Sequence, residues 1–222
     1  MMPPNLQLYQ ARLDISQTEC DRLWQFLSED ERSRTNKFKR EHLKRNFVSA
    51  RGNLRVILGQ WLDCEPNEIQ FSYSDRGKPY LQNLKNSQEI YFNLAHSQDL
   101  AVYVVCSDRE VGIDLEFINY KCDVESIAKR YFLPSEQKII NSFGDRDEHG
   151  KYLAFYRAWT LKEAYGKATG QGIANILDRV DVAPLLESPA GEVLQIDNWI
   201  LKLLSTELEI EQGYSAAVCI SN

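Results

Sequence analysis

The stretch Val111-Gly112-Ile113-Asp114-Leu115-Glu116 decides which fold and which chemistry we expect of this chain. Apolar and acidic residues alternate toward its end, which is the period-two pattern of a β-strand. Asp114 and Glu116 then project from the same face, where two carboxylates repel each other unless a cation lies beside them. Magnesium is typically held by one or two carboxylates together with waters and substrate phosphates. The stretch therefore indicates either a magnesium site that takes a phosphate ligand or an exposed strand edge that carries two acids.

Length and composition predict a globular protein of one large domain or two small ones. The 222 residues are 43% apolar and 26% charged, which are ordinary values. The longest nearly pure apolar run, residues 100–106, is too short to cross a membrane. The first residues lack the basic start and the apolar stretch of a signal peptide. The five cysteines lie far apart without a Cys-x-x-Cys pair, so we expect reducing cytoplasm, no disulfide framework and no zinc site.

The charge is acidic overall but basic in one segment. A net charge of −6 argues against general nucleic-acid binding. Residues 37–55 nevertheless contain seven basic side chains and one acidic one. This segment predicts a specific anionic partner, or else a solvated helix face.

The spacing of apolar residues predicts an α+β fold. Long helices are expected at residues 42–62 and 151–169, and strands at residues 89–94, 100–106 and 111–117 are expected to form one mainly antiparallel sheet. Further strands are expected at residues 180–183, 192–196, 199–204 and 214–220. The repeated pattern Phe-x-x-Ala at residues 47 and 155 suggests two similar halves that meet near residue 107, each with a long helix packed on a sheet.

The second long helix carries polar and aromatic side chains on one face. Trp159, Glu163 and Lys167 lie on it, and a purely solvated face would not favour tryptophan. Glu163 could supply a third carboxylate to the metal or act as a base, and Lys167 could hold a phosphate. The alternative is a surface Glu–Lys pair that contributes a few tenths of a kcal/mol, about 0.2–0.5.

Two further residues add to these candidates. We expect His96 on a loop after a strand, where it could donate to a phosphate oxygen or only make local hydrogen bonds. Lys78 lies in the turn Gly77-Lys78-Pro79, where it could serve as a point charge for phosphate or remain solvated. Glycine-rich nucleotide-binding motifs are absent from the sequence. Together the candidates are the parts of a phosphoryl-transfer site.

Four blocks give the sequence a resemblance to the 4′-phosphopantetheinyl transferases of the larger, surfactin-synthetase-activating type. In chain order they are Gly77-Lys78-Pro79, Phe92-Asn93-Leu94-Ala95-His96-Ser97, Val111-Gly112-Ile113-Asp114-Leu115-Glu116, and residues 159–170, which read Trp-Thr-Leu-Lys-Glu-Ala-Tyr-Gly-Lys-Ala-Thr-Gly. The chain departs from the family at Ala95, where many members carry serine.

The resemblance implies a fold of two pseudo-symmetric halves with coenzyme A in the cleft between them. Residues 1–107 would supply the basic helix and the adenine and 3′-phosphate side, and residues 108–222 the metal and catalytic residues. The enzyme would move the phosphopantetheine arm of coenzyme A to a serine of an apo carrier protein of a fatty-acid, polyketide or peptide synthase, releasing 3′,5′-adenosine bisphosphate. We expect a cytoplasmic monomer that binds neither nucleic acid nor a membrane.

The resemblance also assigns roles to single residues. Asp114 and Glu116 would hold magnesium, with Glu163 as a third ligand or as the base. Residues that would contact the coenzyme are His96 and Lys167 at the phosphates, Arg76, Gly77, Lys78 and Pro79 on the adenine and 3′-phosphate side, and Ser49 and Arg51 on the first long helix. The alternatives are a non-catalytic module that binds coenzyme A or docks carrier proteins, and a magnesium-dependent phosphohydrolase.

Overall fold

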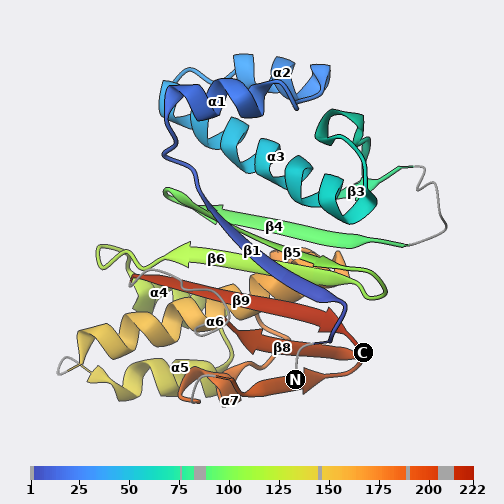
Figure 1. The fold of residues 1–222 in the computed structure, drawn as a ribbon. Helices are drawn as coiled ribbons and strands as arrows, with labels where there is room; N and C mark the ends of the chain where they lie inside the picture. Colours follow the sequence, from blue (N-terminus) through green and yellow to red (C-terminus); the bar gives the residue numbers. More distant parts are fainter. Residues whose placement is uncertain (1–2, 76, 83–88, 145–146, 189–190, 205–212) are drawn as a thin grey trace.

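The computed structural model describes residues 3–75, 77–82, 89–144, 147–188, 191–204 and 213–222. The α+β fold of two halves is confirmed (Figure 1). The first half consists of β1 (Leu6–Arg12), α1 (Gln17–Trp24), α2 (Glu29–Asn36), α3 (Glu41–Leu62), β2 (Phe71–Tyr73), β3 (Pro79–Leu81), β4 (Tyr91–Ser97) and β5 (Leu100–Cys106). The second half consists of β6 (Val111–Phe117), α4 (Val124–Tyr131), α5 (Pro134–Ser142), α6 (Glu148–Thr169), α7 (Ala183–Leu186), β7 (Val193–Ile196), β8 (Trp199–Leu203) and β9 (Tyr214–Ser221).

Each half has its own antiparallel sheet. The first sheet has the order β1-β5-β4, the second has the order β6-β9-β8-β7, and β2 and β3 form a separate hairpin. The expectation of one sheet from residues 89–117 is therefore wrong. Strand β6 pairs with β9 over its full length, from Val111 opposite Ile220 to Phe117 opposite Tyr214. Its other edge faces β4, which meets it through the side chains of Asn93 and Ser97.

The two sheets lie between the two long helices, and β5 shows why (Figure 1). All seven residues of β5 are buried, because one face packs under α3 and the other against the second sheet. Tyr103 belongs to the core with Leu54 and Leu58 of α3. Its neighbour Val104 belongs to the core with Val218 of β9. The layers are thus α3, first sheet, second sheet and α6, and an unbroken apolar strand is what burial on both faces requires.

Helix α6 lies directly against β6 because Gly112 has no side chain. A Cβ atom placed there would lie 2.2 Å from the carbonyl oxygen of Ala164 and 2.4 Å from the nitrogen of Ala168. Asp114 and Glu116 follow on the same face of β6, since side chains alternate along a strand. The glycine therefore brings the two acids under the helix that carries Glu163 and Lys167.

Two local expectations are wrong. Strand β4 continues to Ser97, so His96 lies on the strand opposite Ala101 and not on a loop. Residues 180–183 form no strand; Val182 is buried beside the start of α7, whose first turn contains Pro184. Proline lacks the amide hydrogen that a sheet needs but suits a first helical turn. Among the described residues, no helix is both long and apolar enough to span a membrane.

Candidate active site

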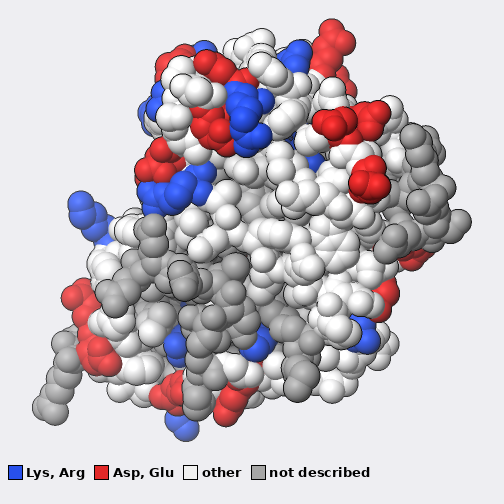
Figure 2. All heavy atoms as spheres, in the orientation of Figure 1, with Lys and Arg blue, Asp and Glu red and all other residues white. Residues whose placement is uncertain are grey.

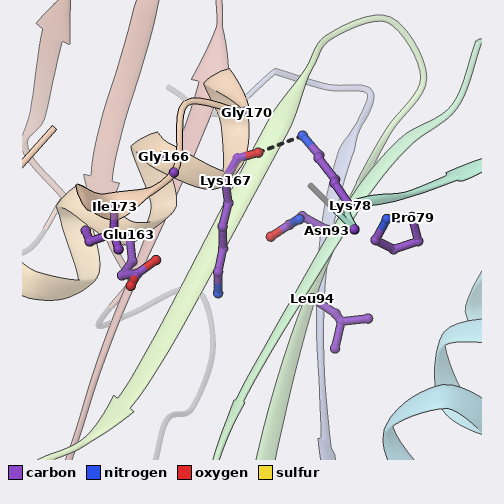
Figure 3. A pocket seen from close by; sticks show the side chains of 11 residues that line it. Lys78, Pro79, Asn93, Leu94, Glu163, Gly166, Lys167, Gly170 and Ile173 are labelled. Carbon is purple, nitrogen blue, oxygen red and sulfur yellow. Dashed lines mark hydrogen bonds between the residues drawn. The ribbon is translucent and has the colours of Figure 1, made fainter. Parts of the chain in front are cut away.

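A cavity of about 260 Å³ lies where the turn at residues 77–79 approaches the end of α6 (Figure 3). Asn93 and Leu94 of β4 line the same side as this turn. Glu163 and Lys167 extend from α6 on the opposite side. The remaining lining residues are Gly166, Gly170, Gly172 and Ile173. Both halves of the chain therefore contribute walls to one cavity.

Asp114 is the most buried acid of the site. Its side chain is 6% exposed, and its Oδ1 accepts a 2.7 Å hydrogen bond from Lys167 Nζ. Its Oδ2 is buried and has no hydrogen-bond partner. Burial raises the pKa of Asp114, and the ammonium of Lys167 opposes this shift. A buried carboxylate oxygen without a donor is costly, so this atom suits a cation.

Glu116 and Glu163 share the electrostatic environment of Asp114. Burial raises the pKa of both glutamates, and the negative charge of Asp114 raises each further. The charge of Lys167 lowers the pKa of each. The structure thus brings the three predicted acids and Lys167 close enough to influence one another. Among the described residues, however, no three His, Cys, Asp or Glu side chains form a ready-made metal site, so the ligand set stays a prediction.

On the side of the first half, His96 provides an imidazole and Arg51 provides a guanidinium. The pKa of His96 is lowered by partial desolvation and then by the positive charges of Lys167 and Arg51. The ring therefore has a stronger tendency to be neutral than an ordinary histidine. The guanidinium of Arg51 lies over the rings of Phe71 and Tyr73. Its Nε lies 3.9 Å from Oε1 of the buried Glu31, and its Nη1 is buried without a hydrogen-bond partner.

Lys78 lies in the cavity wall, but its ammonium is already engaged. Its Nζ donates to the carbonyl oxygen of Lys167 at 2.7 Å (Figure 3). It also donates to the carbonyl oxygens of Ala168 and Val111, each at 3.4 Å. Burial lowers its pKa. The predicted contact between this ammonium and a phosphate therefore has no support in the geometry.

Two other predicted coenzyme contacts lie outside this arrangement. Ser49 is fully buried and donates its hydroxyl to the carbonyl oxygen of Arg12 at 2.9 Å. The structure does not bring it to the cavity. Arg76 lies outside the described residues, whereas Gly77 and Pro79 line the cavity.

The sequence reasoning missed Asn93 and Ser97 as parts of the site. Asn93 Oδ1 accepts a 3.1 Å hydrogen bond from the amide of Ile113. The hydroxyl of Ser97 accepts from the amide of Phe117 at 3.1 Å and donates to Glu116 Oε2 at 3.2 Å. The two residues hold β6 on either side of the acids. A spacing of four on a strand places them on one face, which is the signal that could have found them.

Comparisons with known proteins identify the family of the chain. A family model described as 4′-phosphopantetheinyl transferase superfamily matches residues 110–219. A model described as the N-terminal part of 4′-phosphopantetheinyl transferase matches residues 14–108.

Individual relatives cover most of the chain. It is 42% identical over 207 residues to 4′-phosphopantetheinyl transferase HetI of Nostoc sp., and the aligned region covers 87% of this chain and 86% of the relative. It is 26% identical over 221 residues to 4′-phosphopantetheinyl transferase Sfp of Bacillus subtilis, covering 98% and 93%. It is 30% identical over 167 residues to the human L-aminoadipate-semialdehyde dehydrogenase-phosphopantetheinyl transferase, covering 70% and 53%. The chain therefore belongs to the 4′-phosphopantetheinyl transferases, and it is an enzyme of that class.

Proposed function

We propose that this enzyme transfers the 4′-phosphopantetheine arm of coenzyme A to a serine hydroxyl of an apo acyl or peptidyl carrier protein. The reaction depends on magnesium and releases 3′,5′-adenosine bisphosphate. The observation that carries the proposal is the group of three acids and Lys167, built from β6 and α6, beside a cavity walled by both halves. A site for transferring a phosphate group needs this combination of carboxylates for a metal and cations for phosphate.

The donor set fits magnesium. Asp114 and Glu116 would hold the ion with Glu163 as the third carboxylate, and the buried Oδ2 of Asp114, which has no donor, supports this assignment. Burial raises the pKa of all three acids, and the negative charge of Asp114 adds to the rise for Glu116 and Glu163. When bound, magnesium would offset charge on the phosphates and on the leaving group.

The chain's own residues bind the phosphates and move the proton. The serine oxygen forms a bond to the phosphorus of the pantetheine arm while the bond from that phosphorus to the oxygen of adenosine bisphosphate breaks. The serine proton passes to a base, for which Glu163 is suited because burial and the charge of Asp114 raise its pKa. Lys167 and the neighbouring His96 would orient the phosphates, since both can donate hydrogen bonds to them.

The first half would bind the nucleotide end and steer the carrier. Arg51, with its buried donor, supports an anion on this side. The basic residues before and within α3 have acidic neighbours. Figure 2 shows both signs of charge mixed over α1, α2 and α3, and α2 begins with three acids. We therefore assign this surface to local contacts with phosphate or with an acidic carrier helix, and not to a broad positive field.

We also propose that the enzyme is a cytoplasmic monomer that acts without nucleic acid or a membrane. Two fused halves already supply both walls of the cavity. The five cysteines lie far apart in the sequence without a Cys-x-x-Cys pair, which favours a reducing compartment.

The test is intact mass spectrometry of apo carrier proteins incubated with coenzyme A, magnesium and the enzyme, with and without a chelator. We expect the mass of one phosphopantetheine group to be gained, and the gain to vanish with the chelator. Breakdown of coenzyme A without a carrier would instead indicate a phosphohydrolase. Binding of coenzyme A without transfer to fatty-acid, polyketide or peptide carriers would indicate a docking module.

A further inference from the structure

Lys78 connects the first half to the two elements that carry the catalytic residues. Its ammonium donates to Lys167 and Ala168 at the end of α6 and to Val111 at the start of β6. Helix α6 carries Glu163 and Lys167, whereas β6 carries the other two acids. One side chain therefore bridges all three parts of the site, across a sequence separation of 33 to 90 residues.

The bonds to α6 satisfy acceptors that a helix leaves open. The last four carbonyl groups of a helix have no partner within it, and α6 ends at Thr169. A cation at this end is also favoured by the helix dipole. Lys78 thus acts as the C-terminal cap of α6, contributed by a distant turn.

The turn itself is built to present this lysine. The amide of Lys78 donates to Ser74 Oγ at 3.1 Å, and the amide of Ser74 donates to the carbonyl of Lys78 at 2.9 Å. Gly77 adopts a φ of 79°, a left-handed conformation that favours glycine. Pro79 then fixes the chain as β3 begins. The lysine therefore leaves a tightly hydrogen-bonded turn toward the second half.

Lys78 and the end of α6 lie in opposite walls of the cavity. Residues 77–79 form one wall, and Gly166, Gly170 and Ile173 form the other (Figure 3). We infer that Lys78 is a positioning residue: it fixes the distance between the walls and holds the end of α6 ready for coenzyme A, and it does not bind phosphate through its ammonium. This inference deepens the proposed function, because the ligand whose site it shapes is coenzyme A.

The test compares Lys78→Met with the wild type, with Lys129→Met at an exposed lysine of α4 as the matched control. Hydrogen exchange of the ligand-free proteins is measured by mass spectrometry. We expect exchange to accelerate at least about threefold in the peptide covering residues 166–176 and to remain unchanged in α3, because only the end of α6 loses its cap. Lys129→Met leaves both regions unchanged. Unchanged exchange at residues 166–176 in Lys78→Met would overturn the inference.

The second measurement is the Kd for coenzyme A and for 3′-dephospho-coenzyme A, below the melting temperature. We expect Lys78→Met to raise both Kd values by about the same factor, near tenfold. A rise confined to coenzyme A would show a direct 3′-phosphate contact, and a loss of global stability with unchanged Kd would show a purely structural role. Either result overturns the inference.

A milder variant guards against a folding failure. Ser74→Ala removes the hydroxyl that holds the backbone of Lys78 and leaves the ammonium in place, and Ser74 is exposed. It should shift exchange and Kd in the same directions by smaller factors, and no shift in either would count against the inference. Exchange in the ligand-free protein does not require coenzyme A, so it tests Lys78 even if the proposed function fails.

Discussion

At the scale of single residues, Asp114 is the acid of the site whose burial costs the most electrostatic free energy. The structure buries this carboxylate, gives one oxygen to Lys167 and leaves the other without a donor. The charge costs folding free energy that a neutral residue would not. We therefore expect Asp114 to contribute to function more than to stability.

The variant Asp114→Asn should separate the contribution of this residue to function from its contribution to stability. We expect transfer at saturating magnesium to fall by at least about 100-fold, because a metal ion would be held less well without this carboxylate and a bound ion contributes several kcal/mol of stabilisation to charge that develops in the reaction. The melting temperature should change little, because the amide keeps the shape and removes a buried charge, while Lys167, which is 30% exposed, loses its ion-pair partner. Asp178→Asn, at a carboxylate that is 74% exposed, should change neither quantity. Near-wild-type transfer in Asp114→Asn would refute the metal assignment.

His96 gives a pH signature of phosphate binding. In the free enzyme its pKa lies below the ordinary 6.5, so at pH 6.5 the ring is mostly neutral. A phosphate beside the ring raises this pKa, and binding of coenzyme A should then take up as much as about one proton. The uptake fades at pH values well above the raised pKa of the complex, where the ring is neutral in both states, and at pH values well below the lowered pKa of the free enzyme, where it is protonated in both.

Calorimetry at pH 6.5 in two buffers of different ionisation enthalpy measures this uptake. His96→Gln should remove the share due to the ring, and the difference from the wild type corrects for protons that the phosphates of coenzyme A exchange. Equal uptake by both proteins would place the phosphates away from His96.

At the scale of elements, β6 is held by a ladder on one edge and by side chains on the other. Strand β9 supplies the ladder, and Asn93 and Ser97 of β4 reach the amides of Ile113 and Phe117. We call these two contacts between β4 and β6 the seam. The seam keeps the acids of β6 in place between the halves although β4 and β6 do not pair as strands.

The seam also shows what local sequence can predict. Alternation in β6 and helical spacing in α6 are local patterns, so both elements could be predicted, and the acids with them. Whether β6 would pair with β4 or β9, and where the ammonium of Lys78 would go, depend on residues far away in the chain. A turn with a solvated lysine and a turn whose lysine caps a distant helix have the same local sequence.

Ser97→Ala tests the seam. It leaves the amide of Phe117 and one oxygen of Glu116 without this partner, so we expect the magnesium concentration for half-maximal activity to rise about tenfold, as loss of a group that orients a ligand does. The free energy of unfolding should fall by about 1 kcal/mol. Ser97→Thr retains the hydroxyl and should recover most of both. Equal magnesium dependence in the alanine variant and the wild type would argue against a role in orienting Glu116.

At the scale of the whole molecule, the core between the sheets belongs to both halves. Val102 and Val104 from β5 pack there with Ile113 and Ile220 of the second sheet. Neither sheet could bury this face alone. The resemblance of the halves predicts their shapes, but it does not predict that each completes the core of the other, because which faces meet is a property of the assembled chain.

The two halves should therefore unfold as one unit, and the four tryptophans can show it. Trp24 and Trp61 report on the first half, and Trp159 and Trp199 on the second, so Trp→Phe pairs isolate each signal. We expect both signals and far-ultraviolet circular dichroism to share one denaturation midpoint, as two-state unfolding requires. Ile220→Ala should lower the free energy of unfolding by about 2–5 kcal/mol. It should shift the denaturation midpoint reported by the tryptophans of the first half as far as the midpoint reported by those of the second half. An early transition of the second half alone would mean that the shared core contributes little, and that the cavity between the halves can open without global unfolding.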